Sequence, residues 1–202
     1  LVRSQGIIVC IINFQNSMNY IILLEVHRSG PAANGSGQDG YIAIEWWPDD
    51  FAAIVYATSK GIIVVEAAGN GSEDFDTDIY NHPQSGFPGS WKNPFNLRNP
   101  QSGAIIVGAG SPSSSNNRTI LSFSNWGSRV DVQGWGSSVA STGYGDLQGG
   151  SDDNCWYTNT FSGTSSASPV VTGAIGCIQG RLKARGKTLL TPTTARNIMR
   201  NT

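Results

Sequence analysis

The chain has 202 residues, of which 39% are hydrophobic and 13% are charged, and its formal net charge is -1. This length fits one domain or part of one, and the weak charge gives no electrostatic basis for binding nucleic acid or an acidic membrane. Its longest apolar runs, near residues 7–12 and 21–24, are far too short to span a bilayer. The chain starts with Leu1 rather than Met, so we expect the natural N-terminus to lie upstream.

The first half of the chain alternates apolar runs with one helical pattern. Residues 6–14 and 20–26 are rich in β-branched and apolar side chains, which predicts two buried strands. Residues 46–59 have apolar side chains at helical spacing after a proline and two aspartates, which predicts a helix. Further buried strands are predicted at residues 62–65 and 104–108. This order of strands and helix predicts a mostly parallel sheet with right-handed crossovers.

The second half contains a long loop region, several short strand candidates and two helices. Residues 72–102 are rich in Asp, Asn, Pro and Gly and predict loops. The run of small residues from 164 to 181 predicts a closely packed helix. Thr191 as N-cap and Pro192 at the first helical position predict a last helix that ends at Arg200. Short strands are predicted at residues 120–123, 130–133 and 138–142.

Residues 161–169, Phe-Ser-Gly-Thr-Ser-Ser-Ala-Ser-Pro, carry the clearest chemical signal. Ser165 follows a tight Gly-Thr turn and opens the run of small residues that predicts a helix. A hydroxyl at a helix N-terminus lies beside free N–H groups and the positive end of the helix dipole, which suits a nucleophile in acyl transfer. A serine in such a turn is more often a helix cap, so its role depends on the rest of the chain.

Three motifs in a fixed order support the nucleophile interpretation. Residues 163–169 match the Gly-Thr-Ser-x-Ala-x-Pro motif of the subtilisin-like serine proteases, and residues 67–70, Ala-Ala-Gly-Asn, match their oxyanion segment. Residues 122–127 resemble their Phe-Ser-Asn-x-Gly turn. The ordered set resembles peptidase family S8. The resemblance implies an α/β, three-layer fold with a mostly parallel central sheet whose N-terminal part is missing, so that residues 1–202 form the C-terminal portion of one peptidase domain.

The resemblance also assigns roles to individual residues. Ser165 would be the nucleophile of a serine endopeptidase that acts on polypeptides through an acyl-enzyme. The Asn70 amide and the Ser165 backbone N–H would stabilise the oxyanion. Small residues would form the wall of a pocket for a substrate side chain: Ala67, Ala68 and Gly69. A strand edge, which departs from the family's usual Ser-Leu-Gly, would pair with the extended substrate backbone: Glu25, Val26 and His27.

The histidine base of such an enzyme is not evident in this chain. By resemblance, the family's Asp and His precede the oxyanion segment in Asp-Thr/Ser-Gly and His-Gly-Thr motifs, and neither motif occurs here. The chain has two histidines, which we interpret as a substrate-site or rim residue, His27, and a loop residue, His82. No histidine follows Ser165, which excludes an α/β-hydrolase, because those enzymes place their histidine after the serine.

Two hypotheses about the activity therefore stay open. In the first, the chain is the C-terminal portion of an active endopeptidase whose Asp and His lie upstream of Leu1. In the second, it is a non-catalytic binding or interaction domain that has lost the base. The presence of both Ser165 and Asn70 favours the first hypothesis, because a scaffold needs neither. A chain without its base would be inactive alone.

The resemblance requires no cofactor and implies calcium in some loops of the family. Four acidic residues offer such a loop here, although a solvated acidic loop is the interpretation that we favour: Glu73, Asp74, Asp76 and Asp78. The Gly-Ala-Gly sequence at residues 108–110 lacks the third glycine of a dinucleotide-binding loop, so no nucleotide is expected. Secretion is expected from the habit of the family.

Three cysteines are too few and too scattered for a zinc site or a closed disulfide framework. Cys10 lies in an apolar run and Cys177 among apolar residues of a predicted helix, so both are interpreted as packing residues. Cys155 lies in a polar loop. A Cys155–Cys177 disulfide is an alternative that the sequence leaves open.

Overall fold

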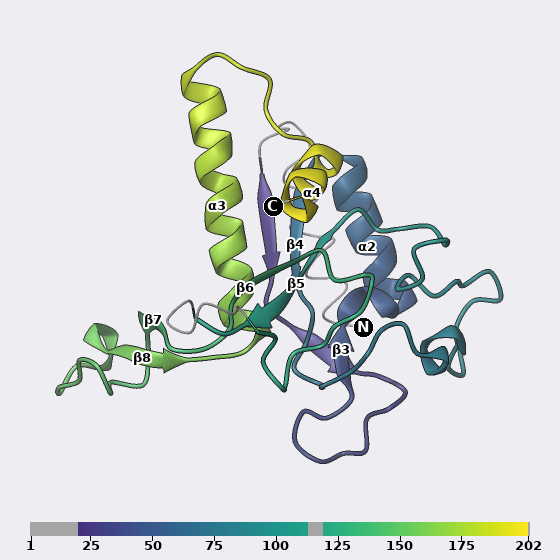
Figure 1. The fold of residues 1–202 in the computed structure, drawn as a ribbon, viewed down its shortest axis with the longest axis horizontal. Helices are drawn as coiled ribbons and strands as arrows, with labels where there is room; N and C mark the ends of the chain where they lie inside the picture. The colour runs from purple at the N-terminus through teal and green to yellow at the C-terminus, as the bar shows by residue number, and fades with distance from the viewer. Residues whose placement is uncertain (1–19, 113–118, 202) are drawn as a thin grey trace.

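The computed structural model describes residues 20–112 and 119–201, which form an α/β fold around one central sheet (Figure 1). The sheet has four strands in the order β1-β4-β5-β6, and every neighbouring pair is parallel. These strands are β1 (Ile21–Leu24), β4 (Ile63–Ala67), β5 (Ile105–Gly110) and β6 (Val132–Trp135). All four were predicted as strands. The further strand predicted at residues 6–14 lies outside the described residues.

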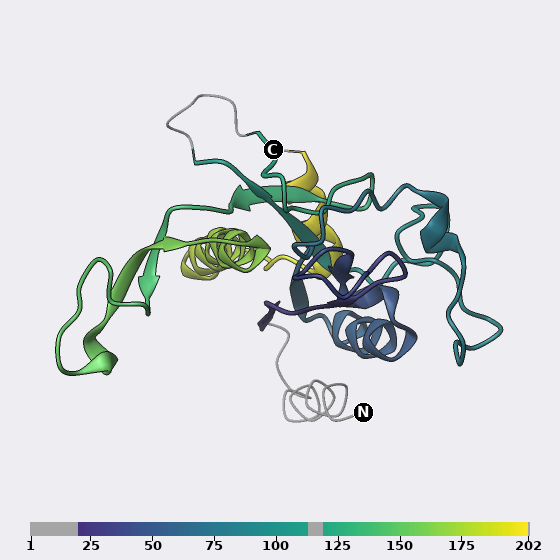
Figure 2. The same cartoon turned by 90° about the horizontal axis from the view of Figure 1, so that it is seen from below.

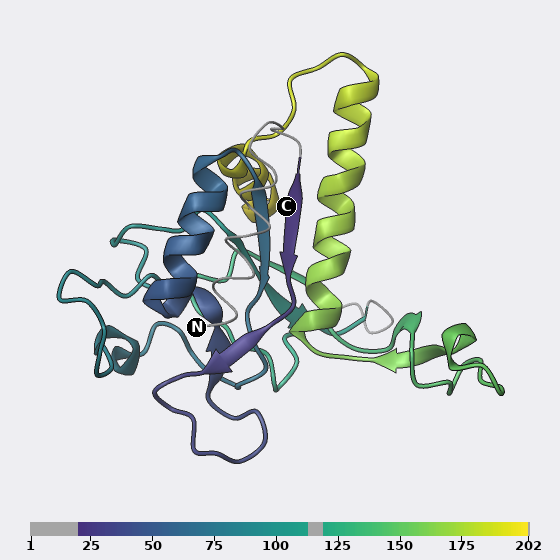
Figure 3. The same cartoon turned by 180° about the vertical axis from the view of Figure 1, so that it is seen from behind.

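Helices cover both faces of this sheet, as the apolar runs of the strands require. Along β4, Ile63 and Val65 contact α3 (Thr164–Ala184) and α4 (Pro192–Arg200), whereas Val64 contacts α2 (Pro48–Ser59) on the other face. Figures 2 and 3 show α2 and α3 on opposite sides of the sheet. The predicted three-layer fold with a parallel central sheet is therefore confirmed.

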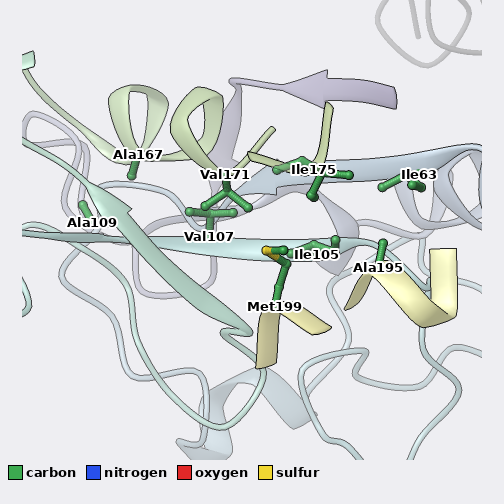
Figure 4. Close-up of a cluster of buried hydrophobic side chains, with 10 residues drawn as sticks. Ile63, Ile105, Val107, Ala109, Ala167, Val171, Ile175, Ala195 and Met199 are labelled. Carbon is green, nitrogen blue, oxygen red and sulfur yellow. The ribbon is translucent and has the colours of Figure 1, made fainter. Parts of the chain in front are cut away.

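The side chains of α3 that pack on the sheet lie four residues apart in the sequence. Ala167, Val171 and Ile175 are buried in one cluster with side chains of β4, β5 and α4, and Figure 4 shows this cluster. Helix α4 begins with a capping box between Thr191 and Thr194, which satisfies backbone groups of its first turn. Both helices occupy the positions predicted from the sequence.

Two short antiparallel pairs lie outside the central sheet. Strands β2 (His27–Ser29) and β3 (Tyr41–Ala43) enclose the loop of residues 30–40, and β7 (Val139–Thr142) pairs with β8 (Tyr157–Phe161). The β7–β8 pair projects from the body on the side opposite the loops of residues 72–102 (Figures 1 and 2). The strand predicted at residues 120–123 is wrong, because only Ile120 forms a bridge, with Gly110.

The long loop region of residues 72–102 folds around an aromatic cluster. Trp46, at the end of the short helix η1 (Ile44–Trp46), and Tyr80, in the short helix η2 (Asp78–Asn81), are both buried there. Phe75 and Phe95 stack in the same cluster, with ring centroids 3.9 Å apart and planes at 12°. The aromatic side chains give this glycine- and proline-rich region a core of its own.

A buried group of charged side chains, here called the Arg129 network, links the sheet to α4. Arg129 binds Glu45 through Nε at 2.8 Å and Asp131 through Nη1 at 2.7 Å. Asp131 also accepts hydrogen bonds from Arg196 and Arg200 of α4, both at 2.9 Å. Burial alone would lower the pKa of Arg129, but the carboxylates of Glu45 and Asp131 raise it. The network therefore holds a fully buried guanidinium in its charged form.

Glu66 lies beside this network on β4. Its Oε1 accepts a hydrogen bond from the Glu45 backbone N–H at 3.0 Å, and its Oε2 has no partner. Burial raises the pKa of Glu66 well above its ordinary value, and the nearby Glu45 carboxylate adds to the effect. A protonated Glu66 avoids an uncompensated negative charge in the interior.

The structure corrects the interpretation of Cys177 as a packing residue. Cys155, at the end of the short helix η4 (Asp153–Cys155), and Cys177, in α3, are both exposed free thiols. Cys177 does not contribute to packing, because the sheet-facing positions of α3 are those of Ala167, Val171 and Ile175. The alternative of a Cys155–Cys177 disulfide is not realised, and Cys10 lies outside the described residues. Within the described ranges, no helix has the length and apolar character needed to cross a membrane.

Candidate active site

The predicted oxyanion asparagine lies directly beside the first turn of α3. Asn70 follows β4, and its Oδ1 accepts hydrogen bonds from the Thr164 backbone N–H at 2.8 Å and from Thr164 Oγ1 at 2.9 Å. Thr164 Oγ1 in turn accepts a hydrogen bond from the Gly69 N–H at 3.1 Å. Because Asn70 Oδ1 is bound by Thr164, the Nδ2 group of the same amide is available as a donor to other partners.

Ser165 is the second residue of α3 and is half-buried. Within residues 20–112 and 119–201, no hydrogen bond engages its Oγ or its backbone N–H. The preceding Gly163 has a φ of +121°, and a methyl group placed on it would lie 3.2 Å from Asn70 Nδ2 and 3.6 Å from Ser165 N. The two predicted oxyanion donors therefore both lie close to one point in space, which glycine leaves free of a side chain.

The turn that carries Ser165 is held by hydrogen bonds to the end of β6. The Gly163 N–H donates to Gly136 O at 2.9 Å. Ser166 Oγ contacts both Gly163 O at 2.9 Å and Trp135 O at 3.2 Å, and Ser166 is buried. The serine thus lies at a fixed junction between β8 and α3, which suits a reacting group that must keep its position.

His27 contacts the Asn70 turn and not Ser165. Its Nδ1 accepts a hydrogen bond from the Asn70 backbone N–H at 3.2 Å, and its ring packs on Tyr41 with centroids 4.9 Å apart. Burial lowers the pKa of His27, which favours the neutral ring that this bond requires. His82 is exposed and pairs with Asp78 at 3.0 Å. Neither of the two histidines of the chain is hydrogen-bonded to Ser165.

Gln38 accepts a hydrogen bond from the Asn70 Nδ2 group, which is predicted to bind the oxyanion. Its Oε1 accepts a hydrogen bond from Asn70 Nδ2 at 3.1 Å. Gln38 is exposed and belongs to the loop of residues 30–40, which is attached to the Asn70 turn by the hydrogen bond from Gly40 N to Gly71 O at 3.0 Å. One of the two Nδ2 hydrogens of Asn70 is thus bound by an oxygen of the chain itself.

The six predicted substrate contacts divide into an exposed group and a covered group. Glu25 and Val26 are exposed between β1 and β2, whereas the backbone of His27 already pairs with that of Ala43 in β3. The residues that precede Asn70 are buried: Ala67, Ala68 and Gly69. Ala68 packs in the aromatic cluster, and the carbonyl of Gly69 accepts a hydrogen bond from Asn125 N at 3.1 Å. A substrate role for these six residues stays a prediction.

The acidic loop holds its carboxylates with donors from the protein. Asp76 accepts hydrogen bonds from Ser128 N at 2.8 Å and Ser128 Oγ at 2.6 Å, and Asp74 Oδ1 accepts one from Asp76 N at 3.0 Å. Asp78 pairs with His82. The described part of the chain contains no group of three or more His, Cys, Asp or Glu side chains arranged around a metal ion. Calcium binding by Asp74, Asp76 and Asp78 stays a prediction.

Comparison with known proteins identifies the family. The model of the subtilase family, peptidase S8, matches residues 29–202 of the chain. The chain belongs to the subtilase family. This family and its fold were predicted from the three sequence motifs, and both predictions are confirmed; the family is one of serine proteases. No curated protein matches the chain.

Solved structures share the fold of this subtilase chain at low sequence identity. Sphericase has a TM-score of 0.58 and 23% identity over 98% of this chain and 53% of its own. The patellamide maturation protease PatA has a TM-score of 0.58 and 21% identity over 97% of this chain and 55% of its own. A lanthipeptide protease has a TM-score of 0.62 and 17% identity over 98% of this chain and 58% of its own. The subtilase chain thus spans about half the length of these structures.

Several contacts of the candidate site were not predicted from the sequence. Thr164 was recognised only as part of the nucleophile motif, yet it binds the Asn70 amide directly. Asn125 was recognised only as part of the motif at residues 122–127, and Gln38 carried no signal at all, since it belongs to a glycine-rich loop. These contacts join positions 32 to 94 residues apart, so no local pattern could have revealed them.

Proposed function

We propose that the protein is a serine endopeptidase in which Ser165 is the nucleophile and Asn70 stabilises the oxyanion. The observation that supports this most strongly is the geometry around Gly163. The Nδ2 group of Asn70 and the backbone N of Ser165 both lie near the space beside its Cα, at 3.2 Å and 3.6 Å from the position of an added methyl group. Two N–H donors close to one point, one of them from the backbone of Ser165 itself, suit a tetrahedral oxyanion.

In this mechanism Ser165 Oγ attacks the carbonyl carbon of a peptide bond, and the carbonyl oxygen becomes an oxyanion. The Asn70 amide and the Ser165 N–H donate to that oxygen, at the N-terminus of α3, where the helix dipole also favours negative charge. A base must accept the hydroxyl proton and then donate it to the leaving amine, which leaves an acyl-enzyme for hydrolysis by water.

We propose that the base and its orienting aspartate come from sequence upstream of Leu1. The reason is that His27 Nδ1 accepts a hydrogen bond from the Asn70 backbone N–H, while His82 lies in the acidic loop with Asp78. The substrate is then a polypeptide that reaches the site along the exposed residues Glu25 and Val26. Action outside the cytoplasm stays a prediction that follows from the family alone.

The alternative is a non-catalytic binding domain. It is supported by the absence of a hydrogen bond between Ser165 and either histidine, and by Gln38, whose Oε1 accepts a hydrogen bond from Asn70 Nδ2. Peptide hydrolysis by the whole protein that carries this chain separates the two functions. We expect Ser165→Ala to abolish hydrolysis. Asn70→Ala should lower kcat about 100- to 1,000-fold, the range known for loss of this donor in subtilisin itself. Hydrolysis that is unaffected by Ser165→Ala, or is absent from the unmodified protein, would favour the alternative.

A further inference from the structure

Asn125 lies completely buried behind the Asn70 turn, in the segment that joins β5 to β6. Its side chain is 0% exposed. It belongs to the sequence motif of residues 122–127, which the proposed mechanism does not use. Ser124 Oγ donates to its backbone carbonyl at 3.0 Å, and the same hydroxyl accepts from the Ala109 N–H of β5 at 2.8 Å. Asn125 is thus held by the central sheet and has no contact with solvent.

The Asn125 amide is hydrogen-bonded on both sides of the Asn70 turn. Its Nδ2 donates to Ala68 O, which precedes the turn, at 2.7 Å. Its Oδ1 accepts from Gly71 N at 3.1 Å and from Glu73 N at 2.8 Å, both of which follow Asn70. The backbone N–H of Asn125 donates to Gly69 O at 3.1 Å. The backbone before and after Asn70 is therefore bound to one side chain.

The same amide also ties the Asn70 turn to β3. Its second Nδ2 hydrogen donates to Tyr41 O at 2.7 Å, so the side chain makes the four hydrogen bonds that a primary amide can make. The fit is close, because a methyl group on Gly69 would lie 2.8 Å from Asn125 Nδ2 and 2.9 Å from Tyr41 O. Gly69 also has a φ of +96°, a conformation that favours glycine.

We propose that Asn125 is a positioning residue that holds the Asn70 amide at the oxyanion site. The inference rests on the proposed role of Asn70. Asn125 acts through the backbone on both sides of Asn70, while Thr164 binds the Asn70 side chain itself. Alanine at position 125 leaves several buried backbone groups without partners and allows the turn to shift. A displacement of about 1 Å at a reacting group can lower the rate about 100-fold.

Asn93 provides a matched control for the loss of a buried asparagine. It is 4% exposed, and it also organises a loop: its Oδ1 accepts from Phe95 N at 2.9 Å and its Nδ2 donates to Asn81 Oδ1 at 2.9 Å. Among the described residues, none of its hydrogen-bond partners belongs to the Asn70 turn. Asn93→Ala therefore tests what a stability loss of this kind does to the kinetics by itself.

The experiment is a double-mutant cycle on the whole protein, with kcat and KM measured for a peptide substrate. We expect Asn125→Ala to lower kcat about 10- to 100-fold with KM changed less than about threefold, and Asn93→Ala to leave both unchanged. In the Asn70→Ala background, Asn125→Ala should lower kcat no further, because its effect passes through Asn70. An equal loss of kcat in both backgrounds, or an equal loss in Asn93→Ala, would overturn the inference.

A milder variant keeps the test decisive where alanine prevents folding. Asn125→Ser retains one donor and one acceptor, and we expect it to lower kcat by a smaller factor that also disappears in the Asn70→Ala background. If Ser165→Ala and Asn70→Ala behave as expected while the variants at position 125 show no coupling to Asn70, only the positioning role fails. If Asn70→Ala itself leaves kcat unchanged, the proposed oxyanion role fails, and the positioning role fails with it.

Discussion

Replacing Asp131 with asparagine should strongly destabilise the fold, because this side chain is the centre of the Arg129 network. The Asp131 carboxylate is 0% exposed and accepts hydrogen bonds from Arg129, Arg196, Arg200 and the Ile106 backbone N–H. Asparagine removes its charge and turns an amide towards these donors, so Arg129 keeps only Glu45 as a counter-ion. Breaking a buried ion pair in this way costs about 3–5 kcal/mol of unfolding free energy.

The matched control is Asp49→Asn, which breaks an ion pair at the surface. Asp49 binds Arg28 at 3.2 Å with 46% of its side chain exposed, and such pairs contribute about 0.2–1 kcal/mol. Urea denaturation of the two variants and the unmodified chain gives the comparison. If Asp131→Asn does not fold, Arg200→Met, which removes one partly exposed donor, should give an intermediate loss. Equal losses of unfolding free energy for Asp131→Asn and Asp49→Asn would show that the buried network contributes no more than a surface ion pair, contrary to our expectation.

Three further predictions follow from the same packing and electrostatics. Because burial raises the pKa of Glu66, the folded state keeps this proton to a higher pH than the unfolded state, and the free energy of unfolding falls as pH rises through that range. Glu66→Gln should therefore lose less stability between pH 5 and pH 9, and identical melting-temperature profiles would contradict this. Gly163→Ala should lower the melting temperature, because alanine is strained at a φ of +121° and crowds Asn70; a rise would be evidence against the geometry. Cys155 and Cys177 should both react with maleimide in the native protein, as peptide mapping would show, and protection of either thiol contradicts its exposure.

The central fold could be predicted because its strands and helices carry their own patterns. A strand that is buried on both faces has an apolar sequence, as residues 62–65 do. The start of α4 is marked in the sequence by Thr191 as N-cap and Pro192 at the first helical position. The β2–β3 and β7–β8 pairs could not be predicted in full, because their strands are short and of mixed polarity and cross-strand pairing stabilises them. Residues 120–123 have the mostly apolar character of a strand but leave the sheet after one bridge, and the carbonyl of Phe123 accepts a hydrogen bond from Ser72 N at 3.0 Å.

The candidate site could be predicted only as far as its motifs extend. Ser165 and Asn70 were identified because each lies in a short sequence motif that resembles a motif of the family. The contacts of His27 and Gln38 with Asn70 depend on how the β2–β3 pair folds over β4, and those distances are set by the tertiary structure. Cys177 was misread for a similar reason, since apolar neighbours on a helix do not reveal which face meets the sheet.

The measurement that tests the account most directly is labelling with a fluorophosphonate probe, which reacts with activated serine nucleophiles. The whole protein and the 202-residue chain are treated side by side, with Ser165→Ala as control, and the modified peptide is mapped by mass spectrometry. We expect stoichiometric labelling of Ser165 in the whole protein, none in the Ser165→Ala variant, and none in the chain alone, where neither His27 nor His82 is hydrogen-bonded to the serine. Labelling of another serine in the whole protein, or no labelling at all, would contradict the assignment of Ser165. Stoichiometric labelling of the chain alone would contradict the proposal that its base lies upstream.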